Sequence, residues 1–431
     1  MTLPSIALLS QRGFIFVALM CAATCSDAPT SPATPGASAR SLAVGEETTC
    51  ALDAGGVLYC WGLNSSRSEF GVALAERPSS SAPVKLSLPP TDGSTPAVPA
   101  SLSIGPSQHM CAVTGDHAAF CWGRAGLGEM GDGSGGNQGN TYTRVLGSFW
   151  SSIAVGRLTT CGVTTLGTGL CWGANQRGEI GTRAVAIGAT TGTPTPVSVA
   201  DDVKFKRIVA GWLHSCGITT NDTVLCWGDN RSGQLGIGGI DAPEVAANEH
   251  SIPVRISSDE KFADLSLGAT NTCGITFDHR AFCWGANFTG QLGDGTTTSR
   301  GTPTLVAGGL KFVAIAIGSG FAGGTNAIPP VTGAQGSVAH ACALTESGAP
   351  YCWGWNGDGQ LGDGTTIERH APVAVQGSLT LTTIGAGGAS TCGMRQRAIW
   401  CWGANRSGQL GNGSLVSSTR PVSVGAPFAT P

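Results

Sequence analysis

Paired cysteines are the residues whose type and spacing could do chemistry in this 431-residue chain. Fourteen of the sixteen cysteines fall into seven pairs, with nine residues between the partners, or eight in the last pair. Thiolates at such positions could bind a metal, act as nucleophiles or close as disulfides. The pairs are Cys50 with Cys60, Cys111 with Cys121, Cys161 with Cys171, Cys216 with Cys226, Cys273 with Cys283, Cys342 with Cys352, and Cys392 with Cys401.

The spacing favours disulfides over a metal site. Zinc draws its four ligands from close pairs such as Cys-x2-Cys, which these pairs do not resemble. Between Cys216 and Cys226, "GITTNDTVL" alternates on both sides of a polar turn, the pattern of a β-hairpin. Residues that face each other across such a hairpin have Cβ atoms about 4.5 to 5.5 Å apart, near the distance of a disulfide. We expect seven cross-strand disulfides and no metal, with free buried thiols as the alternative.

Two further markers repeat with each cysteine pair. An apolar run that ends in glycine precedes the pair, as in "LAVG" and "LSIG", and a segment such as "PVSV" follows it. Each repeat therefore offers about four β-rich runs separated by turn residues. Every second cysteine is followed by Trp-Gly, and we expect these large rings to pack between repeats. The tryptophans are Trp61, Trp122, Trp172, Trp227, Trp284, Trp353 and Trp402.

Seven repeats of four strands predict an all-β, seven-bladed β-propeller over residues 41–431. Isolated four-stranded sheets would expose both apolar faces, whereas sheets stacked around an axis cover them. The first repeat starts at its glycine-ended strand and the last stops at its Pro-Val strand. From this we expect the ring to be closed by N- and C-terminal strands that share one blade.

The N-terminal residues resemble a targeting segment. The apolar stretch "FIFVALMCAA" is too short for an ordinary membrane-spanning helix, and small residues follow it up to Cys25. Because "AATC" resembles a bacterial lipobox, we expect residues 1–25 to be a lipoprotein signal peptide with Cys25 lipidated. A plainly cleaved secretory peptide is the alternative. Residues 26–40 are rich in Ser, Thr, Pro and Ala and predict an extended tether.

The export signal and the cysteines predict the same location. Disulfides persist in oxidising compartments outside the cytoplasm. We therefore expect the propeller to be exported to the outer side of a membrane or the periplasm, held by the lipid on Cys25, or to be secreted.

The repeat is similar to that of a known family. The runs "CWGDNRSGQLGIG", "CWGANFTGQLGDG", "CWGWNGDGQLGDG" and "CWGANRSGQLGNG" resemble the repeat of the regulator-of-chromosome-condensation family, in its cysteine-bearing, exported bacterial form. Some exported relatives are similar to a propeller-type β-lactamase inhibitor. The nuclear founding member exchanges nucleotide on a small Ras-like GTPase and binds chromatin. The resemblance therefore implies a seven-bladed ring, with an inhibitor or an exchange factor as two alternative functions.

Charge argues against the nuclear function. Charged residues make up only 12% of the chain and the net charge is −3. The five lysines are scattered along the sequence, so no basic stripe is offered to a phosphate backbone. We expect no nucleic-acid partner.

No motif indicates catalysis. The stretch "GDGSGG" at Gly131–Gly136 is similar to a serine-protease sequence, yet it aligns with the turns "GDGTTT" and "GDGTTI" of other repeats. The loop "WNGDGQLGDG" lacks the bidentate acid of a calcium site, so we expect its aspartates to cap turns. We therefore predict a binding scaffold that is monomeric, has no cofactor and is not an enzyme.

Departures from the repeat indicate where a partner would bind, because function in repeat folds resides in loops. The loop "GWLHSC" carries Trp212 and His214, and the insertion between Gly318 and Cys342 carries Phe321 and His340. Both are expected on the same face of the ring. We predict that Trp212, His214, Phe321 and His340 contact a protein or an envelope polymer, with a merely tolerated insertion as the alternative.

Overall fold

The computed structural model describes residues 41–428, with gaps at 54, 66–67, 72–78, 92–94, 107–108, 136–140, 148, 189–191, 243–249 and 322–336. The described residues belong to one compact unit, Ala39–Pro431. The predicted signal peptide, Cys25 and the tether lie outside the described residues. Within the part that the structure describes, no helix is long and apolar enough to cross a membrane.

The described strands form seven sheets of four antiparallel strands each. In chain order the sheets contain β1 (Leu42–Val44), β2 (Thr48–Leu52), β3 (Leu58–Gly62), β4 (Ser80–Leu86); β5 (Pro99–Ile104), β6 (His109–Thr114), β7 (Ala119–Gly123), β8 (Thr143–Arg144); β9 (Trp150–Val155), β10 (Thr159–Thr164), β11 (Gly169–Gly173), β12 (Thr193–Ser198); β13 (Phe205–Ala210), β14 (His214–Thr219), β15 (Val224–Gly228), β16 (Val254–Arg255); β17 (Phe262–Leu267), β18 (Asn271–Thr276), β19 (Ala281–Gly285), β20 (Arg300–Leu305); β21 (Phe312–Phe321), β22 (Ser337–Thr345), β23 (Pro350–Gly354), β24 (Arg369–Ala374); and β25 (Thr383–Ala386), β26 (Ser390–Arg395), β27 (Ala398–Gly403), β28 (Ser418–Ser423).

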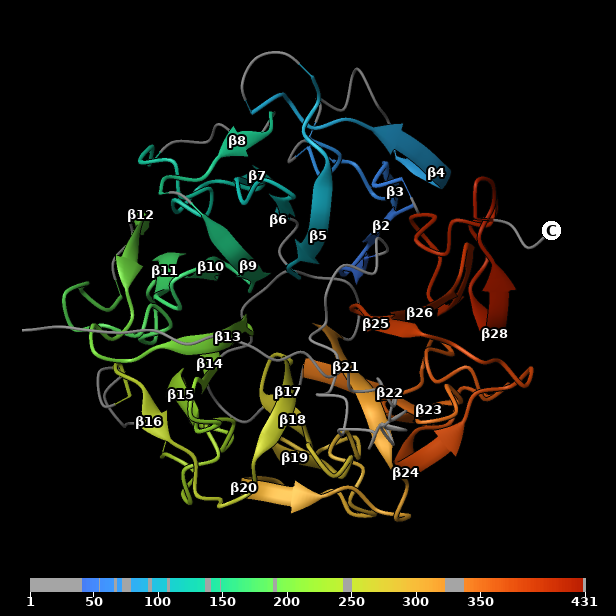
Figure 1. The fold of residues 1–431 in the computed structure, drawn as a ribbon. Helices are drawn as coiled ribbons and strands as arrows, with labels where there is room; N and C mark the ends of the chain where they lie inside the picture. The colour runs from blue at the N-terminus through green and yellow to red at the C-terminus, as the bar shows by residue number, and fades with distance from the viewer. Residues whose placement is uncertain are drawn as a thin grey trace, which may run out of the picture. The chain divides into compact units, whose positions relative to one another are not determined.

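The seven sheets are the blades of a propeller. Figure 1 shows them side by side around a central axis, with the labelled first strands β5, β9, β13, β17, β21 and β25 innermost. This arrangement confirms the predicted all-β, seven-bladed propeller with four strands in each blade.

The second and third strands form the hairpin that the cysteine spacing predicts. In the fourth blade Cys216 pairs with Cys226, and Ser215 pairs with Trp227 one position away. Side chains of neighbouring residues point to opposite faces of a strand, so the disulfide and the indole lie on opposite faces of the blade. Both faces are covered, because every residue of β14 is buried.

Each tryptophan connects its blade to the preceding one, as predicted for these residues. In blade four, the indole Nε1 of Trp227 donates a hydrogen bond of 2.8 Å to the backbone carbonyl of Glu179 in blade three. The same bond recurs at all seven junctions, always to the Gln or Glu of the "GQLG" position. The next residue turns the chain: Gly228 has φ +105°, and a Cβ there would lie 2.5 Å from the carbonyl of Leu213.

The predicted ring closure is wrong. The first blade contains only strands from residues 42–86, and the last contains only strands from 383–423, so no blade combines the two ends of the chain. In the part of the chain that the structure describes, each repeat is one complete blade and no strand is left over to be exchanged. The junction between blades seven and one, which we call the seam, is instead closed by the same kind of hydrogen bond as the other six junctions. Here the indole Nε1 of Trp61 donates to the backbone carbonyl of Gln409 at 2.9 Å.

The C-terminal segment still contributes to the seam through one side chain. In the fourth and fifth blades, an aromatic residue at the start of the first strand packs on the blade's tryptophan, as Phe205 does on Trp227. Blade one begins with Leu42 and has no such residue. Phe428, from the other end of the chain, is buried with its ring centroid 6.0 Å from that of Trp61. The C-terminus therefore supplies an aromatic side chain to blade one rather than a strand.

Candidate functional site

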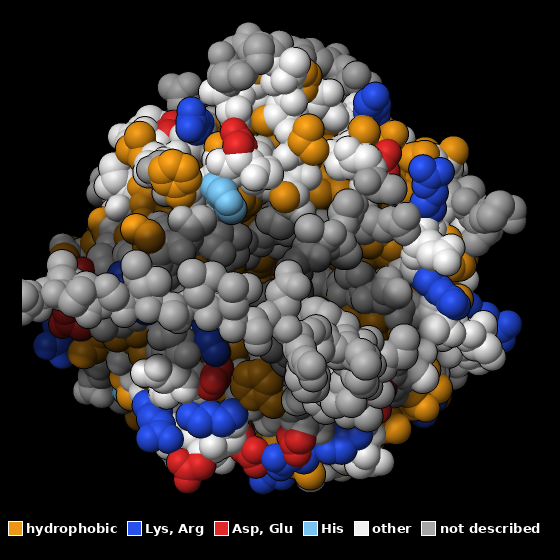
Figure 2. All heavy atoms as spheres, viewed as in Figure 1, with side chains coloured by type: hydrophobic (Ala, Val, Ile, Leu, Met, Phe, Trp, Pro, Cys, Tyr) orange, Lys and Arg blue, Asp and Glu red, His pale blue; other side chains and the backbone are white. Residues whose placement is uncertain are grey.

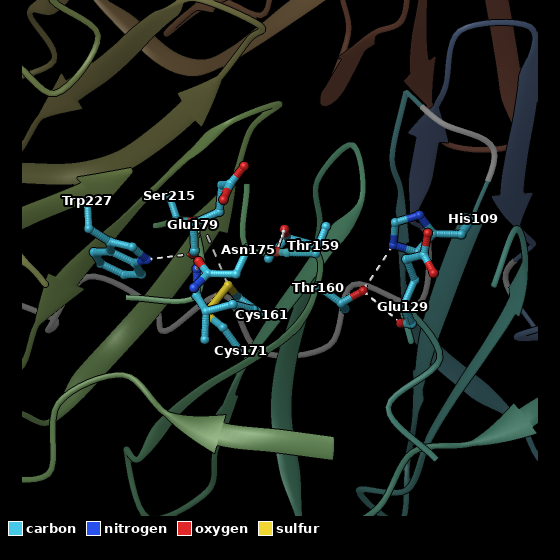
Figure 3. Close-up of a disulfide and its surroundings, with 12 residues drawn as sticks. His109, Glu129, Thr159, Thr160, Cys161, Cys171, Asn175, Glu179, Ser215 and Trp227 are labelled. Carbon is cyan, nitrogen blue, oxygen red and sulfur yellow. Dashed lines mark hydrogen bonds between the residues drawn. A yellow bond between two sulfur atoms is a disulfide. The ribbon is translucent and has the colours of Figure 1, made fainter. Parts of the chain in front are cut away.

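All seven predicted cysteine pairs are joined as disulfides inside single blades. The bonded cysteines lie directly opposite each other across the second and third strands, with Cα atoms 4.0 to 4.1 Å apart. Figure 3 shows Cys161 and Cys171 enclosed between neighbouring blades. Among the described residues, no group of three or more His, Cys, Asp or Glu side chains could hold a metal ion. The cysteines thus hold hairpins closed.

The histidines of the repeat are buried, which corrects the prediction that they lie on a binding face. His214 and His340 begin or lie within second strands and are almost fully covered. Their Nε2 atoms lie 2.9 and 2.8 Å from the hydroxyl oxygens of Thr272 and Thr391 in the next blade. His109 makes the same contact with a threonine of the third blade, as Figure 3 shows. These histidines contact the neighbouring blade and cannot reach a partner.

The threonine settles which histidine nitrogen carries the proton. Thr160 donates its hydroxyl hydrogen to the carbonyl of Glu129, 3.0 Å away, so Nε2 of His109 must be the donor to that hydroxyl. Burial lowers the pKa of His109 to about 3 and that of His214 to about 4. Each imidazole is therefore neutral near pH 7 and serves as a hydrogen-bonded link between blades.

Of the two aromatic residues of the predicted surface, the structure describes the side chain of Trp212 but not that of Phe321. Trp212 is only 7% exposed, and the guanidinium carbon of Arg157 lies 5.1 Å from its ring centre. Its backbone N–H donates to the carbonyl of Gly268 in the next blade at 3.3 Å. Trp212 therefore packs within the ring, contrary to its predicted role. Phe321 ends β21, and its side chain and residues 322–336 of the insertion lie outside the described residues.

Exposed side chains that differ from blade to blade lie on the opposite face of the ring from the loop that contains Trp212. We call this the hairpin face: it contains the turns between second and third strands and the residues that lead into the first strands. There, Phe149 accepts a backbone bond from Thr165 at 2.7 Å, and Lys204 accepts the equivalent bond from Thr220 at 2.9 Å. We call the residue immediately before each first strand's initial buried residue a strap residue. In blades two to six the strap residues are Val98, Phe149, Lys204, Lys261 and Lys311.

The fold gathers lysines that are scattered in the sequence. Four of the five lysines are exposed on the hairpin face of blades four to six: Lys204, Lys206, Lys261 and Lys311. Only Lys85, on the outer strand of blade one, lies elsewhere. The sequence shows no basic stripe because the stripe is assembled from equivalent positions of three repeats. Only an alignment of the repeats to the fold would have revealed it.

Acidic side chains accompany these bases. Lys206 pairs with Asp222 at 2.5 Å, and Arg280 binds Glu260 at 2.7 Å and Asp278 at 2.6 Å. The hydrogen bond from Arg280 is the main cause that lowers the pKa of Asp278 to about 2. Figure 2 shows positive and negative side chains together over the blades that carry β16 to β20. We call this mixed surface the charged sector; it comprises Lys206, Arg207, Asp222, Glu260, Lys261, Asp264, Asp278, Arg280 and Lys311.

Blades two and three present a different surface on the same face. Phe149 is 61% exposed and Leu166, in the neighbouring turn, is 82% exposed. The backbone bond from Thr165 to the carbonyl of Phe149 places the residue before Leu166 against Phe149, so the two exposed residues lie on neighbouring segments of this face. We call Phe149 and Leu166 the apolar pair.

Two family models match the repeats. Both are described as the regulator of chromosome condensation (RCC1) repeat. One matches residues 39–67, 205–234 and 262–291, and the other matches 221–275, 278–323, 347–394 and 398–429. Together the matches cover just over half of the chain.

Individual relatives share the repeat over most of this chain. The ultraviolet-B receptor UVR8 of Arabidopsis thaliana is 26% identical over 345 residues, which are 78% of this chain and 69% of the receptor. The human E3 ubiquitin-protein ligase HERC2 is 27% identical over 299 residues, 66% of this chain but only 6% of HERC2. The crystal structure of Prp20p from Saccharomyces cerevisiae superposes with a TM-score of 0.69 at 18% identity, covering 89% of this chain and 87% of that one. This last likeness concerns the fold alone.

Proposed function

Because the chain belongs to the regulator of chromosome condensation (RCC1) repeat family, we propose that it is a non-catalytic propeller scaffold. It binds a protein partner through loops on one face of the ring. The observation that carries this proposal is the charged sector, where three adjacent blades present charged side chains of both signs on the hairpin face. Mixed charges favour a protein surface over a nucleic acid, which would meet the acids of the sector as well as its bases.

The setting of this function is outside the cytoplasm. Seven disulfides within blades suggest an oxidising compartment, where such bonds persist. We include in the proposal that residues 1–25 direct export and that Cys25 carries the lipid anchor. Mass spectrometry of the mature N-terminus checks this part: diacylated Cys25 supports the anchor, and an unmodified N-terminus beyond Cys25 contradicts it.

The absence of a catalytic role is part of the same proposal. The repeated histidines are engaged between blades and are neutral near pH 7, so they are poorly placed to exchange protons with a substrate. Arg280, the charged group with the most partners in the charged sector, holds two carboxylates through charge-assisted hydrogen bonds. Such a surface fits recognition better than turnover.

Capture of the partner by matched lysine variants tests the charged sector. The purified chain is immobilised, envelope extract is passed over it, and bound proteins are quantified by mass spectrometry. Lys261→Glu and Lys311→Glu should each lower recovery of the partner at least about tenfold, because a reversed charge meets a complementary surface. Lys85→Glu is the matched control, since Lys85 is exposed but lies on the outer strand of blade one. Equal recovery by all three variants would contradict the sector's role.

A further inference from the structure

We propose that the apolar pair, Phe149 and Leu166, is the centre of a surface through which two copies of this chain associate about a two-fold axis. Asp116 flanks the pair on one side and Lys204 on the other. This self-association, which departs from the monomer expected from the sequence, lies in blades two to four and does not depend on the partner that the charged sector binds.

The four residues lie in one continuous row on the hairpin face. His117, next to Asp116, accepts a hydrogen bond at 2.9 Å from the N–H of Trp150, which follows Phe149. Phe149 is joined through its carbonyl to the turn that holds Leu166. Lys204, which precedes the first strand of blade four, contacts blade three: its Nζ donates to the hydroxyl of Thr168 at 3.1 Å. The order along the face is therefore acid, apolar pair, base.

The backbone conformation of Phe149 is unfavourable for a bulky side chain, which points to a role for that side chain outside the fold. Its φ is +63°, in the left-handed region, which is unusual for a bulky residue. That conformation is strained for a residue with a Cβ, and glycine avoids the strain. Its ring is nevertheless mostly exposed, so burial within the chain does not offset the strain. Strained, exposed residues of this kind are candidates for contact with another molecule.

The charge order selects a second copy as the occupant. A two-fold axis lays the row on itself in the reverse direction, so Asp116 of one copy meets Lys204 of the other while the apolar pairs cover each other. The hydrogen bond from Thr114 lowers the pKa of Asp116, which keeps its carboxylate ionised. An anionic membrane fits less well, because Asp116 and Asp222 lie on the same face.

The association is expected to be weak. Stable complexes bury roughly 1,200–2,000 Å², far more than two exposed side chains provide. The contact should therefore depend on protein concentration, and it would be strengthened where the chain is held at a surface.

Sedimentation velocity of the purified chain over a range of concentrations tests the proposal. The weight-average mass should rise toward that of a dimer. Asp116→Lys and Lys204→Asp should each weaken association at least about tenfold, because like charges then face each other. The double variant exchanges the two charges within each copy, so association should return to within about threefold of the original. A chain that stays monomeric at every concentration, or a double variant that is not rescued, overturns the proposal.

Two further variants separate the apolar pair from the fold. Phe149→Gly should abolish association while near-ultraviolet circular dichroism stays unchanged. Phe277→Gly is the matched control: Phe277 is 56% exposed on the same face, in the turn between β18 and β19 of blade five, outside the row. Retained association of Phe149→Gly, or equal loss in both variants, would contradict the assignment.

Discussion

The junctions between blades and the hairpin face use repetition in opposite ways. At the junctions, backbone and side chain repeat together: an indole donates to a Gln or Glu carbonyl seven times. On the hairpin face, equivalent backbone bonds recur, as at Phe149 and Lys204, while the side chain changes from Val98 through Phe149 to three lysines. Where the side chain repeats, it holds the ring together. Where only the backbone repeats, the side chain is free to serve recognition.

The largest effect is expected from a junction tryptophan. Trp227 is fully buried and bonded to the preceding blade, so Trp227→Ala removes a large packed ring and a hydrogen bond. We expect a loss of about 3–5 kcal/mol in the free energy of unfolding, measured by guanidinium denaturation without reductant. Phe277→Ala, on the hairpin face, should change it by no more than about 0.5 kcal/mol. Similar losses for the two would erase the distinction between junction and face.

The disulfides are expected to contribute the next largest effect. Replacing Cys216 and Cys226 by alanine opens a short loop, which should cost about 2–3 kcal/mol in the chain-entropy description. The same change at Cys392 and Cys401 should cost a similar amount, because the two hairpins are equivalent. Denaturation of both double variants checks this. Roughly fourteen reactive thiols in the denatured, unreduced chain would mean that the bridges are absent.

A pH-dependent effect should distinguish two junctions of the same design. Burial raises the pKa of Glu179 from its ordinary 4.5 to about 8, whereas blade four has Gln234 at this position. Between these values the folded state holds a proton that the unfolded state has released. The stability from this group is therefore complete below pH about 4.5 and declines as the pH rises toward 8.

Glu179→Gln should flatten that decline. The amide oxygen can accept the backbone hydrogen of Arg177, as the carboxyl does at 2.7 Å, and it has no proton to lose. Melting temperatures of Glu179→Gln and the parent chain between pH 5 and 8 should diverge, with the variant relatively more stable at pH 8. Gln234→Glu is the reciprocal control and should add a decline of the same sign. Parallel curves for the parent and Glu179→Gln would show that Glu179 does not titrate in this range.

The sequence was sufficient for the features that repeat and failed where contacts depend on three dimensions. Cysteine spacing alone located seven hairpins and their bridges, because facing positions in a hairpin are fixed by chain distance. The histidine prediction failed for a local reason. The loop between β13 and β14 in blade four contains only residues 211–213, so His214 already begins a buried strand.

Two other features depended on contacts far apart in sequence. The closure of the ring was mispredicted because Phe428 completes blade one with a ring rather than a strand, and no periodicity marks a single side chain. The charged sector was missed because Lys206, Lys261 and Lys311 come onto one surface only when their blades stand side by side.

The smallest predicted effect tests most directly the claim that the hairpin face is kept for contact rather than for stability. At φ +63°, glycine should be favoured over alanine, so Phe149→Gly should unfold at a higher denaturant concentration than Phe149→Ala. The account predicts an advantage of about 1 kcal/mol for Phe149→Gly, with a stability equal to or above that of the parent chain. A Phe149→Gly variant that is clearly less stable than both Phe149→Ala and the parent would contradict it, since Phe149 would then be a structural residue.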